Sequence, residues 1–327
     1  MAESRLFRSL VLITLAMSLA LIITSSLMHV GNVGMGSPDW PGSYGLITEH
    51  GASAEATPPA SSAILPTAAI DRAHRAIASA LQLLIIAVFV MALRRRETPS
   101  LSLSVPMMAL GLSLFLAFLG VWFGSPLRYP AVVILNLTGG IGLLALFWWL
   151  TLDIYAGTNR GVEQAGKIRA WAIAGLFVLV VEIVLGGWTD AYYAALACTT
   201  FPDCQGQWWP GVKLLDGLAL LGTLDVNEQG KVIIDGGVAA AIHMAHRIGA
   251  LLTFVFIAWL GLKAWGVGGR CQTAGMAVLA LLVVQTGLGI AAVLGDLPMA
   301  VVASHSTLSA VMVLSVLTLA HRGWSGR

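Results

Sequence analysis

Two short segments place histidine next to arginine inside stretches otherwise suited to lipid. AAAIHMAHRIGALL, residues 239–252, carries His246 and Arg247, and DRAHRAIASAL, residues 71–81, carries His74. Polar residues within a membrane span usually mark a functional site. A neutral imidazole is a good ligand for a transition metal, and arginine pairs with carboxylates. The two segments therefore predict a metal or cofactor site, although an intramembrane histidine can also simply hydrogen-bond to a neighbouring helix.

The composition that surrounds these segments is that of an integral membrane protein. Hydrophobic residues make up 57% of the 327 residues and charged residues 10%, and the mean hydropathy is +0.85. A helix that crosses a bilayer needs about 20 mostly apolar residues. Stretches of this kind are residues 9–29, 72–93, 102–123, 130–152, 170–189, 238–262, 273–294 and 299–320. The sequence therefore predicts an all-α integral membrane fold with eight transmembrane helices.

The basic residues predict how the chain is oriented. With both termini in the cytoplasm, twelve of the 18 lysines and arginines fall on the inner side: Arg5, Arg8, Arg94, Arg95, Arg96, Arg160, Lys167, Arg169, Lys263, Arg270, Arg322 and Arg327. This bias follows the positive-inside rule and predicts a multi-pass protein of the bacterial inner membrane. The net charge of +2, without a basic patch interleaved with aromatics, argues against nucleic-acid binding.

The chain also repeats itself. AHRAIASAL at 73–81 aligns with AHRIGALLT at 245–253, and VVILNLT at 132–138 aligns with VVASHST at 301–307. SPDWPG and FPDCQG, in the long outside loops, align in the same order. We expect two four-helix bundles in parallel orientation, residues 1–152 and 170–327, joined by a cytoplasmic linker over 153–169, because an even number of spans per half prevents inversion.

The repeat brings the polar residues to one depth. His74 and His246 lie near the outer ends of their spans, and Asn136 and His305 lie one to two turns into theirs. His246 and His305 can then face each other across a bundle, as the two axial ligands of a haem iron require. Arg247 and Arg75, next to the histidines, are candidates to pair with haem propionates.

Three further polar residues have less specific interpretations. Glu182, within a predicted span, is costly there unless it is protonated or paired, so we expect it to hydrogen-bond within the second bundle or to carry protons. His243 lies one turn before His246 and is expected to support it, or to begin the helix, without binding metal. His321, at the cytoplasmic end, is expected to be solvated.

The cysteines predict one disulfide. Cys198 and Cys204 have five residues between them in an outside loop, where the environment is oxidising. No histidine lies close by in that loop, which makes a metal site the weaker alternative. Cys271, on the cytoplasmic side, is expected to be a free thiol.

Over nearly its whole length the chain resembles the haem A synthase family of cytochrome oxidase assembly. The resemblance is carried by SPDWPGSYG (37–45), AHR (73–75), LGGWTDAYYAALAC (185–198), FPDCQGQWWP (201–210), IHMAHRIGA (242–250) and VVASHSTL (301–308). It implies that the C-terminal bundle holds a haem b cofactor between His246 and His305, and that the N-terminal bundle binds the substrate, haem O. The family oxidises a ring methyl of haem O to a formyl by successive hydroxylations, giving haem A.

The resemblance also implies roles for Asp71 and for several partners. Asp71 stands three residues before His74, where the family has a glutamate, and is expected to handle a proton or stabilise a cationic intermediate together with His74. Haem O and haem A are the implied small-molecule partners, with membrane lipid around the chain. Haem O synthase, oxidase assembly proteins and a second copy of the chain are further expected partners.

Several positions depart from the family pattern. Asn136 replaces a histidine of the N-terminal bundle, Ser37 and Ser43 replace a cysteine pair, and His29 stands where an arginine is usual. These departures favour an alternative: a haem-binding oxidase assembly factor or haem carrier without oxidation activity. A solute transporter with a duplicated bundle would need broken helices and polar residues at the midplane, which the sequence does not predict.

Overall fold

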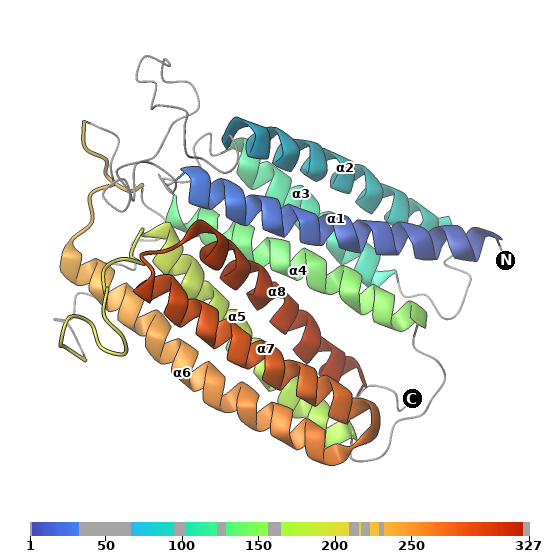
Figure 1. Cartoon of the computed structure of the whole chain (residues 1–327). Helices are drawn as coiled ribbons and strands as arrows, with labels where there is room; N and C mark the ends of the chain where they lie inside the picture. Colours follow the sequence, from blue (N-terminus) through green and yellow to red (C-terminus); the bar gives the residue numbers. More distant parts are fainter. Residues whose placement is uncertain are drawn as a thin grey trace.

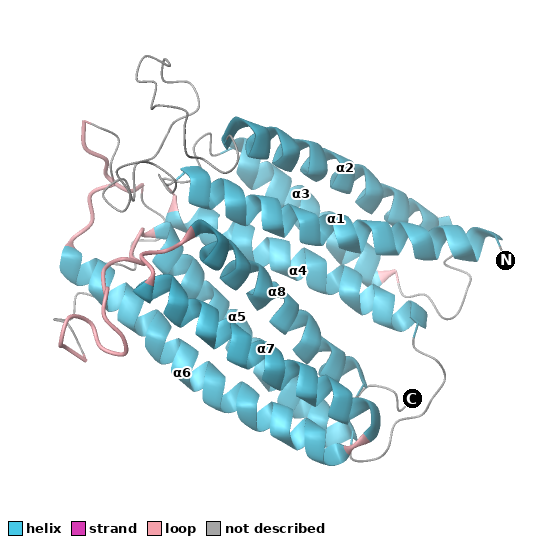
Figure 2. Cartoon of the chain, viewed as in Figure 1, coloured by secondary structure: helices cyan, strands magenta, loops and turns pink. Residues whose placement is uncertain are grey.

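The computed structural model is built from long helices packed side by side (Figure 1). The structure describes residues 2–32, 67–94, 103–122, 129–155, 165–208, 216, 223–228 and 232–322. Within these residues the chain forms helices and loops, with two isolated β-bridges and no strand (Figure 2). The predicted all-α class is therefore confirmed for the described part of the chain.

Each predicted span coincides with a helix. The helices are α1 (Ala2–Asn32), α2 (Thr67–Arg94), α3 (Ser104–Trp122), α4 (Pro130–Tyr155), α5 (Ala165–Ala191), α6 (Gly236–Val267), α7 (Gly269–Leu294) and α8 (Met299–Arg322). All except α3 are long and apolar enough to cross a bilayer. At 1.5 Å per residue, the 19 residues of α3 extend about 28 Å, close to the thickness of the hydrocarbon core.

Apolar side chains cover the outer surface of the helices. Leu83 and Phe177 are each 70% exposed, and Val283 is 66% exposed. Exposed residues of this size are unfavourable in water but suit the acyl chains of a bilayer. Together with the hydropathy of the helices, they support a multi-pass membrane protein.

Helix contacts follow the same order in both halves of the chain. In the first half, α1 and α3 each contact α2 and α4, so α2 and α4 lie diagonally opposite. In the second half, α5 and α7 each contact α6 and α8, which makes α6 and α8 the diagonal pair. The aligned histidine segments therefore occupy equivalent corners of the two rings of helices.

The two halves meet through α1, α4, α5 and α8. Trp148 Nε1 of α4 donates to Thr318 Oγ1 of α8 at 2.9 Å. Nearer the helix ends, His321 Nε2 lies 2.8 Å from Asp153 Oδ1, and the His321 ring packs edge-on against Trp149. The expectation that His321 is solvated was wrong, because this carboxylate and this indole leave its side chain only 13% exposed.

Helix α1 starts and α8 ends on the same side of the molecule, and the loop after α5 lies on the opposite side (Figure 1). His74, Asn136, His246 and His305 all lie in the first half of an even-numbered helix. These helices all begin at the end opposite the termini, so the four residues lie at similar depth, as the repeat predicts.

Candidate functional site: two imidazoles on diagonal helices

His246 is positioned by a well-capped helix. Asp235 is the N-cap of α6, and its carboxylate accepts from the backbone N–H groups of Gly237 at 2.8 Å and Val238 at 3.2 Å. Such a cap satisfies N–H groups that have no partner within the helix. The cap fixes where α6 begins, and His246 follows three turns later.

The His246 ring contacts a carboxylate and a glycine of α5. Its Nδ1 lies 2.9 Å from Glu182 Oε1, and the Glu182 side chain is 14% exposed. A Cβ added at Gly186, one turn after Glu182, would lie 3.2 Å from His246 Cε1. A larger residue at this position would push the imidazole a few tenths of an ångström away from the α5 backbone. Glu182 therefore lies beside His246 within the second half, and its expected hydrogen bond or proton-carrying role stays a prediction.

His305 has a similar environment on α7. Its Nδ1 lies 3.1 Å from the backbone carbonyl of Gln285, and its Nε2 lies 3.4 Å from the Gln285 side-chain nitrogen. A Cβ at Gly289, one turn after Gln285, would lie 3.0 Å from His305 Cε1. In both places the residue that contacts Nδ1, Glu182 or Gln285, is followed four residues later by a glycine that lies against the same ring.

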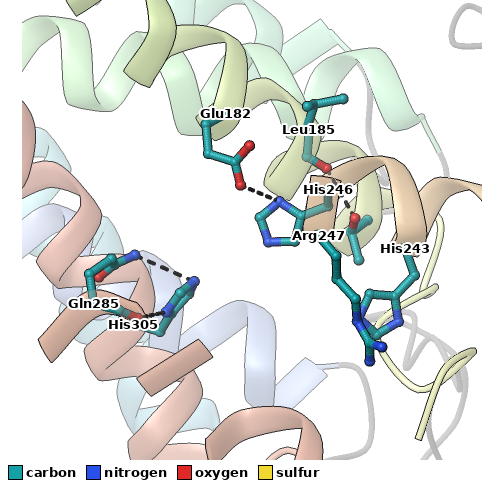
Figure 3. A network of polar contacts seen from close by, with 8 residues as sticks. Glu182, Leu185, His243, His246, Arg247, Gln285 and His305 are labelled. Atoms are coloured by element: carbon teal, nitrogen blue, oxygen red, sulfur yellow. Dashed lines mark hydrogen bonds and ion pairs between the residues drawn. The ribbon is translucent and has the colours of Figure 1, made fainter. Parts of the chain in front are cut away.

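The partners determine which ring nitrogen is free. A carboxylate or carbonyl next to Nδ1 favours the tautomer with the proton on Nδ1, because these oxygens can only accept. In that tautomer the lone pair sits on Nε2, the form that binds a metal. In His305 the Gln285 amide nitrogen lies 3.4 Å from this atom. His246 Nδ1 has no hydrogen-bond partner among the described residues, although Glu182 Oε1 lies 2.9 Å away. In Figure 3 the His246 and His305 rings come from α6 and α8 with no other labelled side chain between them.

These features fit an iron held between two imidazoles. Both carboxylate oxygens of Glu182 and Nδ1 of His246 are buried without a hydrogen-bond partner among the described residues, so this corner has polar atoms that a bound group could satisfy. Groups of three or more His, Cys, Asp or Glu that could hold a bare metal ion are absent from the part of the chain searched. Two imidazoles are a donor set that suits a haem, whose porphyrin supplies the other ligands.

Arg247 points to the loop after α5. Its guanidinium donates to the carbonyl oxygens of Cys198 at 2.6 Å, Thr200 at 2.7 Å and Asp203 at 2.7 Å. It also lies over the Phe201 ring, 5.9 Å from the centroid. This arrangement ties α6 to the loop, and the expected pairing of Arg247 with a haem propionate stays a prediction.

The loop itself is closed by the predicted disulfide. The sulfur atoms of Cys198 and Cys204 are 1.99 Å apart, and Cys271 is free and buried. The Thr200 hydroxyl and the Gly206 N–H, followed by the Arg247 charge, hold the pKa of Asp203 below its ordinary value. The Asp203 carboxylate therefore stays charged and organises the loop above α6.

His243 is buried next to the Arg247 guanidinium. Its side chain is 3% exposed, and its Nε2 accepts from Arg247 Nε at 3.3 Å. Figure 3 shows its ring beside the Arg247 guanidinium and away from His305. His243 therefore contacts Arg247, whereas its predicted role was to support His246 or to begin the helix.

The first half of the chain has one imidazole, His74, where the second half has His246, and Asn136 where the second half has His305. His74 Nδ1 lies 3.4 Å from Thr24 Oγ1 of α1, and Asp71 is buried at 5% exposure one turn earlier on α2. Asn136 lies on α4, the helix diagonal to α2, and Arg75 is exposed. Ser37 and Ser43 lie outside the described residues, as does the side chain of His29.

Sequence reasoning missed four residues of these sites: Gly186, Gln285, Gly289 and Thr24. One signal was available, because Glu182–Gly186 and Gln285–Gly289 share the same four-residue spacing and the same distance from the end of their helices. Thr24 carried no signal, since a threonine in a membrane helix ordinarily bonds to its own backbone, as Thr24 also does to Ala20.

Comparison with known proteins shows similarity over nearly the whole chain. Residues 8–318 match the family described as cytochrome oxidase assembly protein. The chain is 31% identical to a haem A synthase of Shewanella oneidensis, over 95% of both chains. Haem A synthases of Caulobacter vibrioides and Methylobacterium radiotolerans are 26% and 31% identical over 59% and 58% of this chain, which covers 53% and 48% of theirs.

Proposed function

Because the chain belongs to the family of cytochrome oxidase assembly proteins, we propose that it is a haem A synthase. Its reaction is the oxidation of a ring methyl of haem O to the formyl of haem A, by successive hydroxylations, for cytochrome oxidase biogenesis. The observation that carries the proposal is the pair of imidazoles on the diagonal helices α6 and α8, each with Nδ1 within 3.1 Å of an oxygen on a neighbouring helix.

In this proposal, His246 and His305 hold a haem b cofactor through their Nε2 atoms. A bound haem supplies one-electron chemistry. Gly186 and Gly289 let the rings lie close to α5 and α7, which fixes their orientation. The second half of the chain is then an electron-transfer site.

The substrate, haem O, is assigned to the first half. His74 is the imidazole available there to bind its iron, and Arg75 is the candidate for a propionate. The amide of Asn136, on the diagonal helix, is a poor iron ligand but can donate a hydrogen bond. Asp71, buried one turn before His74, is placed to hold or pass a proton next to the reacting haem.

The finer architecture belongs to the same proposal. The two rings of helices are two four-helix bundles in parallel orientation, and α3 is the eighth span. The cytoplasmic linker over 153–169 joins bundles formed by residues 1–152 and 170–327. Both termini face the cytoplasm of a bacterial cell with the protein in its inner membrane, surrounded by lipid. Haem O synthase, oxidase assembly proteins and a second copy of the chain are its candidate partners.

A second function is favoured by Asn136. If an imidazole at this corner is required for oxidation, the chain is a haem carrier or haem-binding assembly factor that binds both haems without converting haem O. The altered residues all lie in the first half, whereas both imidazoles of the second half are present.

Haem extraction distinguishes the two functions. The chain is expressed in a bacterial host that makes haem O but lacks its own haem A synthase, and extracted haems are separated by chromatography. Haem A is expected, together with haem b that co-purifies with the protein. Matched variants His74→Ala and His321→Ala separate the site from general effects, since only the first should abolish haem A. Haem b with unconverted haem O would establish the carrier, and no bound haem would refute both functions.

A further inference from the structure

The seam between α2 and α3 distinguishes the two rings of helices. Of the neighbouring helix pairs within both rings, α2 and α3 share the least extensive contact among the described residues. The equivalent pair, α6 and α7, packs backbone against backbone, since a Cβ added at Gly275 would lie 2.6 Å from the Gly261 carbonyl oxygen. The same order of helices therefore gives a closed seam in the second half of the chain and a loosely packed seam in the first.

The hydrophobic core of the first half leaves the far end of this seam unfilled. On α2 the buried cluster runs from Leu81 to Ala92, and around α3 its members run from Leu103 to Leu112. Both stretches lie in the part of the helix nearer the chain termini (Figure 1). His74 lies in the opposite part of α2, which we call the outer half. On these two helices the core cluster therefore ends before the level of His74.

The outer half of α3 is largely uncovered. Leu114, Phe115 and Phe118 are 53%, 45% and 52% exposed, and Ala117 between them is exposed as well. Apolar surface of this kind is stable against acyl chains, and equally against an apolar ligand that comes from the lipid. The outer half of the seam thus borders the bilayer.

Gly120 marks a space on α3 that the second half fills at the equivalent position. It precedes Asn136 by 16 residues, as Gly289 precedes His305. At Gly289 the space is taken by the His305 ring, whose Cε1 would lie 3.0 Å from an added Cβ. At Gly120 an added Cβ would have no atom of the described residues within 4 Å. Next to α3, at the level of Asn136, the first half therefore has room that an imidazole occupies in the second.

We propose that the outer half of the α2–α3 seam is the opening through which the substrate haem enters the first half sideways from the bilayer, and through which the product leaves. This inference rests on the proposed function, because it requires a substrate site at His74. Haem O suits such a route, since its isoprenoid chain keeps it in the lipid. The chain then stays in an apolar environment throughout the exchange.

The second half has the opposite requirement, because a cofactor must stay bound. Its α6–α7 seam is closed at Gly261 and Gly275, and the loop after α5 is fixed over α6 by Arg247 and by the disulfide of Cys198 and Cys204. The difference between the two seams therefore matches the difference between a haem that is exchanged and a haem that is retained.

The test is a cross-link across the seam in the full-length protein, with Cys271→Ser removing the native free thiol. Ala78→Cys on α2 and Ala117→Cys on α3 both lie in the outer halves, and a bifunctional thiol reagent joins them. Uptake of haem O from phosphatidylcholine vesicles is followed by the absorbance change on binding. The link is expected to slow uptake at least about tenfold, because the opening then limits the rate, and to leave co-purified haem b unchanged.

Met91→Cys with Val105→Cys, linked in the same way, is the matched control. Both native side chains pack against the core cluster, where the seam is already closed, so uptake is expected to equal that of the unlinked protein. Single substitutions decide the question if the double-cysteine variants do not fold. Ala117→Trp adds an indole to the outer half of α3 and is expected to slow uptake, whereas Met107→Trp, exposed nearer the termini, is not.

The outcomes separate this inference from the proposed function. Unchanged haem O uptake by the protein linked in the outer half would overturn the opening while leaving haem binding intact. Equal slowing by the control link would also overturn it, because entry would then not depend on the outer half. Wild-type protein that takes up no haem O would instead refute the substrate site, and with it the proposed function.

Discussion

Replacement of Gly289 by alanine should loosen the haem without weakening the fold. The added Cβ would lie 3.0 Å from His305 Cε1, whereas an ordinary contact is 3.4–4 Å, so the ring must retreat by at least about 0.4 Å. Binding constellations must be held within about 0.5 Å of their productive geometry, so a shift of this size takes up most of that tolerance. Misplacing a ligand in this way typically costs about 10- to 100-fold in affinity, or about 1.4–2.7 kcal/mol.

The helix itself gains from the same change. Alanine is favoured over glycine in a helix interior by roughly 0.5–1 kcal/mol. Gly287→Ala, two residues earlier on α7, has no atom within 4 Å of its new Cβ and shares this gain. The two variants therefore differ in their effect on His305 and not in helix propensity.

The assay is the rate at which haem leaves the purified protein for a high-affinity acceptor such as apomyoglobin, with thermal unfolding measured in parallel. Gly289→Ala is expected to lose haem at least about tenfold faster than the wild type. Gly287→Ala is expected to match the wild type. Equal haem loss from the two variants would refute the argument that the glycine sets the position of the His305 ring.

Three further predictions concern the loop and the start of α6. Asp235→Ala removes the N-cap and should lower the free energy of unfolding by about 1 kcal/mol, while Asp235→Asn keeps it; thermal unfolding in detergent checks both. Arg247→Lys leaves one ammonium to contact three carbonyl oxygens, so the rate of amide hydrogen exchange over residues 198–208 should rise roughly tenfold. An unchanged exchange rate would show that the Arg247 contacts do not hold the loop. Because the Thr200 hydroxyl and the other loop contacts lower the pKa of Asp203, its carboxylate stabilises the loop above the ordinary value of 3.8, and this contribution is lost as the pH falls through the lower folded value. Asp203→Asn should therefore make the loop more susceptible to proteolysis near neutral pH, and the difference from the wild type should vanish in strong acid.

The sequence was sufficient for everything that depends on local composition. Eight apolar stretches predicted eight helices, because a membrane span must satisfy its backbone internally and only a helix does so with one segment. The disulfide followed from the short spacing of Cys198 and Cys204 in an outside loop. The Ala-His-Arg repeat also indicated that the two halves place their histidines alike, at corners that the helix contacts make equivalent.

Only the tertiary structure decided what each polar side chain touches. The sequence predicted a haem propionate as a partner of Arg247, and the structure adds contacts of its guanidinium with the carbonyls of the loop after α5. The contact of Glu182 with His246, and that of the Gln285 carbonyl with His305, join residues 64 and 20 positions apart in the chain. Such pairs depend on the rotation of each helix about its axis and on how closely neighbouring backbones approach. Hydrophobicity in a nearly uniform apolar helix does not encode that rotation, since lipid and core select the same residues.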